Sequence, residues 1–372
     1  MSIVQPKGQP WLHSAAFDGV FILAPAFIIT AVVFIFADTW QALDGIPPWL
    51  WVVLIIGIDV SHVYSTLYRT YFDASEYTQR RTLYTTVPWV ALTVSIVLYS
   101  LDPALFWRVL AYLAVFHFVR QQYGFMMMYK RTEPRLGRWQ HRIDQWMIYL
   151  APVYPLIFWH THAREFNWFI LGDFVEIPLT WLSHVAGVLY VLVIMAYVVK
   201  EYWLFRRFKF VNMPRNALVA GTALSWYVGI VYFNNDLAFT ATNVVAHGIP
   251  YLALIWLYRR NAERSAAKSP SSNFSRWPFF TFMLLISIVA LAYVEETLWD
   301  GLVWKEHGDV LPFSAWLPQI TDAALLALIV PLLALPQITH YVLDAFIWRL
   351  REAGTPWKAI LFQRDRIGIV SD

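Results

Sequence analysis

Four histidines stand in apolar stretches of this sequence, and each has another polar residue one helical turn away. These sets are Asp59 with His62, His117 with Arg120 and Gln121, Asn243 with His247, and His340 with Asp344. Residues three or four apart share one face of a helix. Imidazoles with nearby carboxylates are ligands that proteins offer to zinc, iron and copper. The pattern predicts a metal site, in which Asp59, Asn243 and Asp344 are further ligands or acceptors that orient the imidazoles.

The composition predicts an integral membrane protein. Hydrophobic residues make up 59% of the 372 residues, charged residues 14%, and the mean hydropathy is +0.48. Soluble domains carry roughly a quarter of charged residues. The net charge of +3 does not indicate a nucleic-acid partner, so membrane lipids are the expected surroundings. The absence of cysteine excludes disulfides, iron–sulfur clusters, thiolate zinc sites and cysteine nucleophiles.

Apolar stretches long enough to cross the hydrocarbon core, about 20 residues each, recur along the chain. They lie at 17–38, 48–69, 83–101, 104–129, 143–163, 177–199, 214–233, 237–258, 277–295 and 317–348. We therefore expect an all-helical polytopic membrane protein with about ten transmembrane helices. The last stretch is too long for one straight span, and Pro331 and Pro336 predict a kink in it.

Lys and Arg gather in alternate connections between these stretches. They cluster at 69–81, 130–142, 200–215, 259–276 and 349–366. Because basic residues in short loops stay on the cytoplasmic side, this alternation places both termini in the cytoplasm. We expect a multi-pass protein of the cell membrane, most simply a bacterial inner membrane.

We expect one helical transmembrane domain over residues 1–372. Three segments outside the spans stand out by composition. They are a polar, Ser-rich cytoplasmic linker at 262–276, an aromatic outer loop at 297–316 and a cytoplasmic tail at 350–372.

The topology assigns a depth to each of the four histidines, because a helix rises 1.5 Å per residue. Each of them stands seven to thirteen residues before the basic residue that ends its span. The four helices run in the same direction, so the imidazoles are expected roughly 10 to 20 Å from the cytoplasmic boundary. At this common height they are able to share one ion, whereas His184 lies in the outer part of its span.

A structural interpretation competes with the metal site. A single histidine in a membrane helix often makes an interhelical hydrogen bond and nothing more. Asp59 and Asp344 are also able to form structural ion pairs with Arg69 or Arg120. The common depth of four histidines is the feature that favours the metal.

The function that these residues favour is an oxidoreductase with a histidine-ligated non-haem metal, iron first. Its substrate would be a lipophilic small molecule that enters from the bilayer, and a redox partner would supply electrons. Arg120 and Tyr64 are the candidates to donate a proton or stabilise charge. Arg69 and Gln121 are the candidates to hold a cofactor.

Two other functions stay open at this point. The first is a b-type haem protein that transfers electrons, with axial histidines from different helices and Arg69 or Arg120 beside the propionates. The second is a proton-coupled transporter whose pathway consists of the buried His, Asp and Arg residues. The chain has no inverted repeat, which disfavours the transporter.

Two short segments carry a resemblance to a known family. The His-Phe step in VFHFVRQQ, residues 115–122, and the His-Gly step in VVAHGIPY, residues 244–251, are similar to the bacterial membrane-bound β-carotene dioxygenases. The resemblance implies an iron site held by intramembrane histidines, with His117 and His247 among the ligands. Residues 58–73, IDVSHVYSTLYRTYFD, depart from what that family would lead one to expect.

Overall fold

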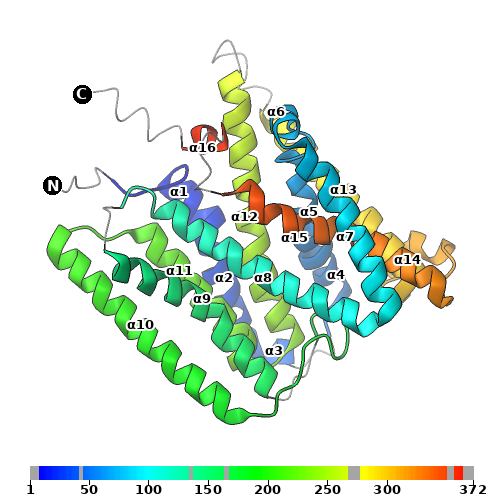
Figure 1. The fold of residues 1–372 in the computed structure, drawn as a ribbon, viewed down its shortest axis with the longest axis horizontal. Helices are drawn as coiled ribbons and strands as arrows, with labels where there is room; N and C mark the ends of the chain where they lie inside the picture. The colour runs from blue at the N-terminus through cyan, green and yellow to red at the C-terminus, as the bar shows by residue number, and fades with distance from the viewer. Residues whose placement is uncertain are drawn as a thin grey trace. The chain divides into compact units, whose positions relative to one another are not determined.

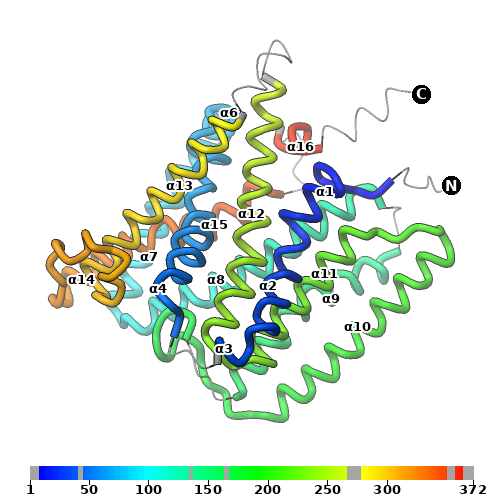
Figure 2. Tube along the Cα trace, turned by 180° about the vertical axis from the view of Figure 1, so that it is seen from behind, coloured from blue at the N-terminus to red at the C-terminus, as the bar shows by residue number. Residues whose placement is uncertain are grey.

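The computed structural model describes residues 8–41, 45–133, 137–162, 167–266, 277–349 and 356–362. Every regular element in these ranges is a helix, so the predicted all-helical class is confirmed. The chain divides into two compact units, with residues 1–44 and 118–250 in unit 1 and residues 45–117 and 251–372 in unit 2. Helices α8 (Pro103–Tyr129) and α12 (Asp236–Ala266) each contribute residues to both units. Figures 1 and 2 show the course of the chain from its front and its back.

Unit 1 is built around α9, which packs against α10, α11 and η4 (Figure 1). Its further elements are α1 (Ala15–Asp18), η1 (Gly19–Leu23), α2 (Ala24–Ile35), α3 (Ala37–Gln41), α9 (Arg138–Thr161), α10 (Thr180–Phe208), α11 (Met213–Trp226) and η4 (Tyr227–Tyr232). Helix α11 also packs on α2, where a Cβ atom at Gly221 would lie 3.1 Å from the Cβ of Ala26. Glycine at this position therefore allows the two helices to approach closely.

Unit 2 places the second span against α13 and α15. Its further elements are α4 (Pro48–Trp51), η2 (Val52–Val60), α5 (Ser61–Ser65), η3 (Thr66–Tyr68), α6 (Ala74–Gln79), α7 (Arg81–Leu101), α13 (Trp277–Trp299), η6 (Asp300–Trp304), η7 (Pro312–Trp316), α14 (Ala323–Leu333), α15 (Leu335–Ile347) and α16 (Pro356–Leu361). Segments η2 and α5 pack on α13, and α15 packs on both α5 and α7.

The second span is not a regular α-helix. Its central part, η2, is a π-helix that ends directly before α5, the segment that carries His62. The hydroxyl of Ser61 donates to the carbonyl of Ile56 at 2.6 Å and so satisfies one carbonyl of the widened turns. Wide helical turns of this kind are frequent at functional sites.

All of the ten predicted spans coincide with helical segments. Seven of these are long and apolar enough to cross a membrane, and the bent pair of α14 and α15 makes up to eight. The coarser prediction of a multi-pass membrane protein is confirmed to this extent. The segments at 143–163 and 214–233 form α9 and α11 with η4, but they are not among these candidates.

The predicted kink lies between α14 and α15. The two helices meet at Ala334 with a bend of 41°. Pro331 lies inside α14, where a proline removes a backbone hydrogen bond and weakens the helix. Pro336 lies in the first turn of α15, where the helix needs no such donor.

The segments that we expected outside the spans are partly described. Helix α12 extends the eighth span to Ala266, and the rest of the linker, 267–276, lies outside the described residues. The outer loop contains η6, which continues α13, and the short helix η7. The described part of the tail at 350–372 contains the short helix α16, in which Trp357 is fully buried.

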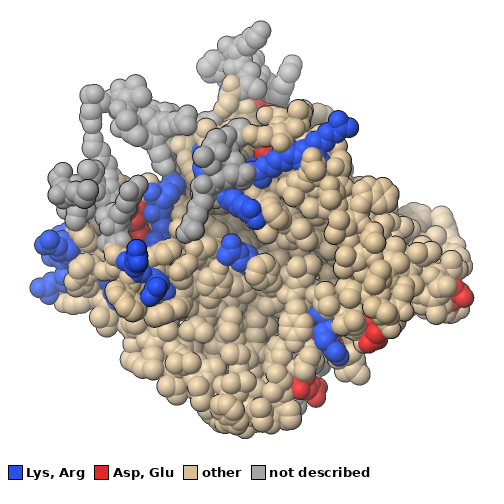
Figure 3. Space-filling view, viewed as in Figure 1, with Lys and Arg blue, Asp and Glu red and all other residues tan. Residues whose placement is uncertain are grey.

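Large apolar side chains are exposed on the helices that the composition marks as spans. Examples are Trp89 on α7, Val188 on α10 and Phe279 on α13. Figure 3 shows one face of the molecule, on which wide areas carry no charged side chain. Such a surface is suited to lipid, since apolar patches of this extent are rare on soluble monomers.

Candidate metal centre

Three of the four predicted histidines meet inside unit 2. His62 comes from α5, His117 from α8 and His340 from α15, and none is more than 3% exposed. The ring centroids of His117 and His340 are 4.6 Å apart, and those of His62 and His340 are 5.0 Å apart. The Nε2 atoms of His340 and His117 face each other at 3.1 Å. Three helices thus direct three imidazoles to one point.

The other ring nitrogens of these histidines have oxygen atoms beside them. Nδ1 of His340 is 2.6 Å from the hydroxyl of Thr66. Carboxylate oxygens lie somewhat farther from the Nδ1 atoms of the other two rings. They belong to Asp344, 3.7 Å from His117, and to Asp59, 3.6 Å from His62. An oxygen acceptor at Nδ1 favours the tautomer in which Nε2 keeps its lone pair for a metal.

A chain of hydrogen bonds connects two of these supporting groups. The hydroxyl of Tyr251 donates to Oδ1 of Asp344 at 2.7 Å. The same hydroxyl is 3.0 Å from the hydroxyl of Thr66, which contacts His340. The chain therefore runs from His340 through Thr66, Tyr251 and Asp344 to the vicinity of His117. It orients the imidazole of His340 and brings the carboxylate of Asp344 near the imidazole of His117.

His247 belongs to unit 1, where it is held by its own neighbours. Its ring stacks on Phe118, with centroids 3.8 Å apart and planes 13° from parallel. Gln121 donates through Nε2 to the backbone carbonyl of His247 at 2.9 Å. Asn243, one turn earlier on α12, donates to the carbonyl of Phe239 at 3.0 Å. Among the described residues, the buried amide oxygens of Gln121 and Asn243 have no hydrogen-bond partner.

His62, His117, His247 and His340 together form a buried group that could hold a metal ion. Each histidine offers one ring nitrogen, and these four atoms all lie within 4.8 Å of one another. The expectation that the four imidazoles gather together is confirmed, and their depth in the membrane stays a prediction.

The separations suit one ion after a small contraction. Nitrogen ligands about 2.0–2.1 Å from a metal lie roughly 3.3 Å apart in a tetrahedron and at most about 4.2 Å apart across the ion. The His117–His340 separation of 3.1 Å is close to the first value. The four ring nitrogens lie within 4.8 Å of one another, slightly more than the roughly 4.2 Å expected across an ion. Rotation of one imidazole can close this difference.

Two other predicted site residues have partners of their own in unit 2. Arg69 is fully buried and pairs with Glu76 at 2.8 Å, and its positive charge also acts on the carboxyl group of Asp344. The hydroxyl of Tyr64 donates to Oε2 of Glu295 at 2.5 Å. The roles of Arg69 in cofactor binding and of Tyr64 in catalysis stay predictions.

Arg120 lies on the exposed side of α8 in unit 1. Its guanidinium donates to the hydroxyl of Tyr149 at 2.6 Å and lies 5.1 Å from the ring centroid of Tyr123. His117 and Gln121 on the same helix are buried. Arg120 is therefore directed toward α9, and its catalytic role also stays a prediction.

Thr66 and Tyr251 are functional candidates that the sequence reasoning missed. Thr66 follows His62 by four residues, and Tyr251 follows His247 by four residues. The same one-turn rule that singled out Asp59 and Asp344 would have found both. Hydroxyl side chains were not considered as partners, although they accept hydrogen bonds from imidazoles as carboxylates do.

A second buried polar cluster, here called the Asp144 network, lies in unit 1. Its members are Lys130, Glu133, Asp144, Lys200, Glu201 and Arg215. Lys130 and Lys200 both donate to Asp144, which is fully buried. Arg215 pairs with Glu133 at 2.7 Å and also with Glu201. Burial raises the pKa of Glu133, although Arg215 beside it acts in the opposite direction.

Comparison of the chain with family models, with curated proteins and with solved structures finds no match. The candidate site therefore rests on the residues and their geometry.

Proposed function

We propose that this chain is an integral-membrane metalloprotein in which the four histidines bind a transition metal, and that it acts as an oxidoreductase on a lipophilic substrate. The observation that carries the proposal is the pair of Nε2 atoms of His117 and His340, 3.1 Å apart, with oxygen acceptors near both Nδ1 atoms. A neutral imidazole has one donor and one acceptor nitrogen. If both Nδ1 atoms carry the protons, two lone pairs face each other, and a cation between them removes the repulsion.

The ligand set favours a metal of intermediate softness. Imidazole nitrogens suit zinc, copper, iron and nickel, and the absence of thiolates excludes the softest sites. We favour iron, because the His117 and His247 segments resemble the membrane-bound β-carotene dioxygenases. An iron ion in this position would supply redox chemistry, with electrons from a partner protein.

The protein's own groups would position that metal and tune it. Asp59 and Asp344 lie behind His62 and His117 and would raise the basicity of these imidazoles. The buried amide oxygens of Gln121 and Asn243 are available to bind the hydrogen atoms of a water or substrate hydroxyl. Two carboxylates near the group would also offset the positive charge of the ion in a low-dielectric interior.

The b-type haem alternative is less compatible with this geometry. Axial histidines of a haem stand on opposite sides of a flat macrocycle, whose plane must be free of other side chains. Four ring nitrogens within 4.8 Å of one another crowd that plane. A single small ion fits the group better.

Metal analysis with an absorption spectrum of the purified protein tests the proposal. The parent protein is expected to retain about one ion of iron, or to take up one equivalent of Fe²⁺ or Co²⁺, without a Soret band. Replacement of His117 or His340 by Ala should remove most of the bound metal, since each supplies one of few ligands. The loss should exceed the roughly 10- to 100-fold drop in affinity that follows removal of a supporting residue.

His184→Ala is the control, because His184 is exposed on α10. Its metal content should equal that of the parent. Equal losses in His117→Ala and His184→Ala would contradict the assignment, and a Soret band that requires His117 would replace it by the haem protein.

A further inference from the structure

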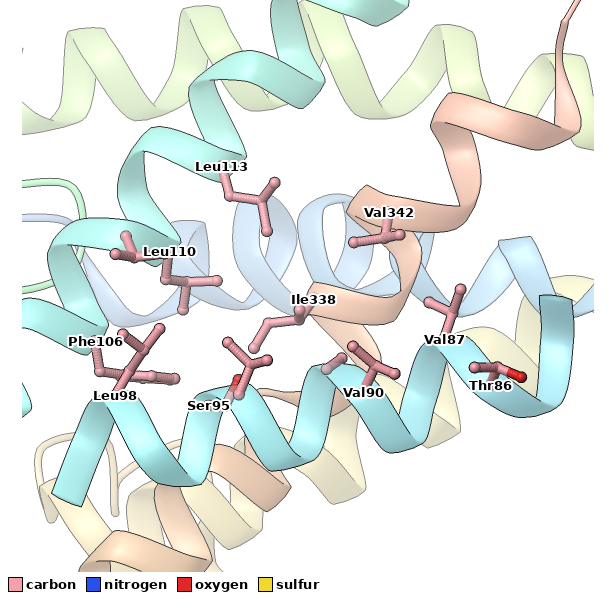
Figure 4. A pocket seen from close by; sticks show the side chains of 13 residues that line it. Thr86, Val87, Val90, Ser95, Leu98, Phe106, Leu110, Leu113, Ile338 and Val342 are labelled. Carbon is pink, nitrogen blue, oxygen red and sulfur yellow. The ribbon is translucent and has the colours of Figure 1, made fainter. Parts of the chain in front are cut away.

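Unit 2 contains an apolar cavity between α7, α8 and α15, shown in Figure 4. Its volume is about 320 Å³, at the small end of the roughly 300–1,000 Å³ of ligand pockets. The lining is almost entirely aliphatic, with Phe106 as its one aromatic residue and Thr86 and Ser95 as its two polar residues. No charged side chain lines it. Such a wall suits a hydrocarbon chain and offers nothing to a charged head group.

The cavity opens on the apolar surface of α7 and α8. Val90 and Val94 on α7 line it and are 53% and 50% exposed, and Val109 on α8 is 42% exposed. At its floor, Phe106 and Leu110 are each only 2% exposed. Both helices are candidate membrane spans, so the exposed rim faces lipid and not water. A molecule dissolved in the bilayer is able to enter from the side.

On two helices, residues of the cavity lining lie within one turn of residues of the histidine group or their stacking partners. Leu113 lines the cavity and precedes His117 by one turn of α8. On α15, Val342 lines the cavity and follows Tyr341, whose ring stacks on His117 with centroids 4.9 Å apart. In Figure 4 the side chains of Leu113 and Val342 point into the same space as Ile338. Along α8, one helical turn with a rise of about 5.4 Å separates Leu113 of the lining from His117.

We propose that this cavity binds the hydrocarbon chain of the substrate, with the reactive end of the molecule directed to the histidine group. The inference rests on the proposed function, because it takes that group as the place of reaction. It specifies the substrate as an amphiphile with an unbranched or lightly branched aliphatic chain that reaches the site from the membrane. Because lipid is as apolar as the lining, the chain gains its binding free energy from close van der Waals packing in the cavity and not from removal from water.

Photolabelling with a decanol that carries a diazirine at its terminal carbon tests the cavity. The protein is reconstituted in lipid nanodiscs, irradiated with the probe and digested, and label is measured on the peptides of α7, α8 and α15. Val94→Trp fills the rim, so labelling of these peptides should fall several-fold. Val90→Trp, at a second rim position, should act in the same direction.

Val97→Trp is the matched control, because Val97 lies on the same helix, is 51% exposed and is not part of the lining. It should label like the parent, and all three variants should keep the metal content of the parent. Equal labelling of Val94→Trp and Val97→Trp would mean that the probe only partitions into surrounding lipid, and would overturn the proposal.

A second measurement tests the orientation of the chain. With Co²⁺ bound, the ¹³C nucleus of the probe's carbinol carbon should relax faster than that of its terminal carbon, and Val94→Trp should abolish the difference. Faster relaxation of the terminal carbon would overturn the orientation. A parent protein that binds probe in the cavity but no metal refutes the proposed function alone, whereas one that binds metal without cavity labelling refutes this inference alone.

Discussion

The two buried polar clusters of this protein differ in how their groups are satisfied. The Asp144 network joins three carboxylates to three cations, and each cation contacts at least one carboxylate. The histidine group brings together four side chains of one kind, whose nitrogens face one another. The first cluster pairs side chains of opposite charge, whereas the second joins side chains of one kind.

This difference separates a structural role from a binding role. Ion pairs that cancel each other inside a protein stabilise the arrangement of the helices that carry them, but they have little left to offer a ligand. Side chains of one kind that converge do not neutralise one another, and contacts from neighbouring residues hold them in place. In the histidine group those contacts come from Thr66, Asp344 and Phe118. We infer that the Asp144 network serves the fold and the histidine group serves the function.

The largest effect that separates the two clusters is expected from Asp144→Leu. The substitution leaves Lys130 and Lys200 without the carboxylate to which both donate. Breaking a buried ion pair by removal of one partner costs roughly 3–5 kcal/mol. The free energy of unfolding, measured by denaturation in mixed micelles, should fall by about that amount. The folded fraction should retain its metal.

His340→Leu is the counterpart in the other cluster. It replaces a buried imidazole by an apolar side chain of similar size and removes the contacts of His340 with Thr66 and His117. The metal-free protein should lose roughly 1–3 kcal/mol, less than Asp144→Leu, while most of the metal is lost. The distinction between the clusters fails if His340→Leu destabilises the metal-free protein as strongly as Asp144→Leu does.

An intermediate effect is expected from Asp344→Asn. The carboxylate near Nδ1 of His117 also accepts from Tyr251, and an amide keeps one acceptor for Tyr251 but removes the negative charge. Loss of a supporting carboxylate lowers metal affinity roughly 10- to 100-fold. Competition with a chelator of known affinity measures the change, with Co²⁺ as the metal.

Asp322→Asn makes the same chemical change outside the site. Asp322 caps α14 by accepting from the backbone of Leu325, a role that Asn fills equally well. Its metal affinity should match the parent. Asp344 is not a supporting residue if the two variants bind Co²⁺ alike.

The helices could be predicted from the sequence because hydrocarbon thickness fixes the length of an apolar span. Their ends could not be predicted equally well. The apolar stretch at 177–199 belongs to a helix that continues to Phe208, and the stretch at 237–258 belongs to one that continues to Ala266. Backbone hydrogen bonds continue a helix into charged sequence, whereas hydropathy marks only its apolar part.

This explains why the Asp144 network was not anticipated. Lys130, Lys200 and Arg215 served in the sequence as markers of cytoplasmic loops. In the structure Lys200 and Arg215 lie within α10 and α11 and are buried. The carboxylate that pairs with the lysines, Asp144, stands near the start of another helix, α9, and nothing in its local sequence indicates these partners.

The sequence predicts the depth of the four histidines in the membrane, but it does not predict which way their side chains point. Spacing from the basic residues places the imidazoles at one height, but the rotation of each helix about its axis decides whether they face each other. That rotation follows from packing, for example from Phe118 stacking on His247 and Tyr341 stacking on His117. The polar residues on one face of each helix indicate that this face points inward. Nothing in the sequence indicates that Phe118 and Tyr341 stack on the histidines.

The smallest effect on metal binding is expected from substitution of Arg120, which the sequence predicts to be a catalytic residue. Its guanidinium is exposed and donates to Tyr149, so Arg120→Gln removes one contact at the surface of unit 1. Its contacts are with Tyr149 and Tyr123, whereas His117 on the same helix is buried. Arg120→Gln should therefore bind Co²⁺ like the parent and unfold at nearly the same denaturant concentration. A loss of metal comparable to that of Asp344→Asn would show that Arg120 supports metal binding. The position of a residue along its helix would then predict membership of the site better than the direction of its side chain.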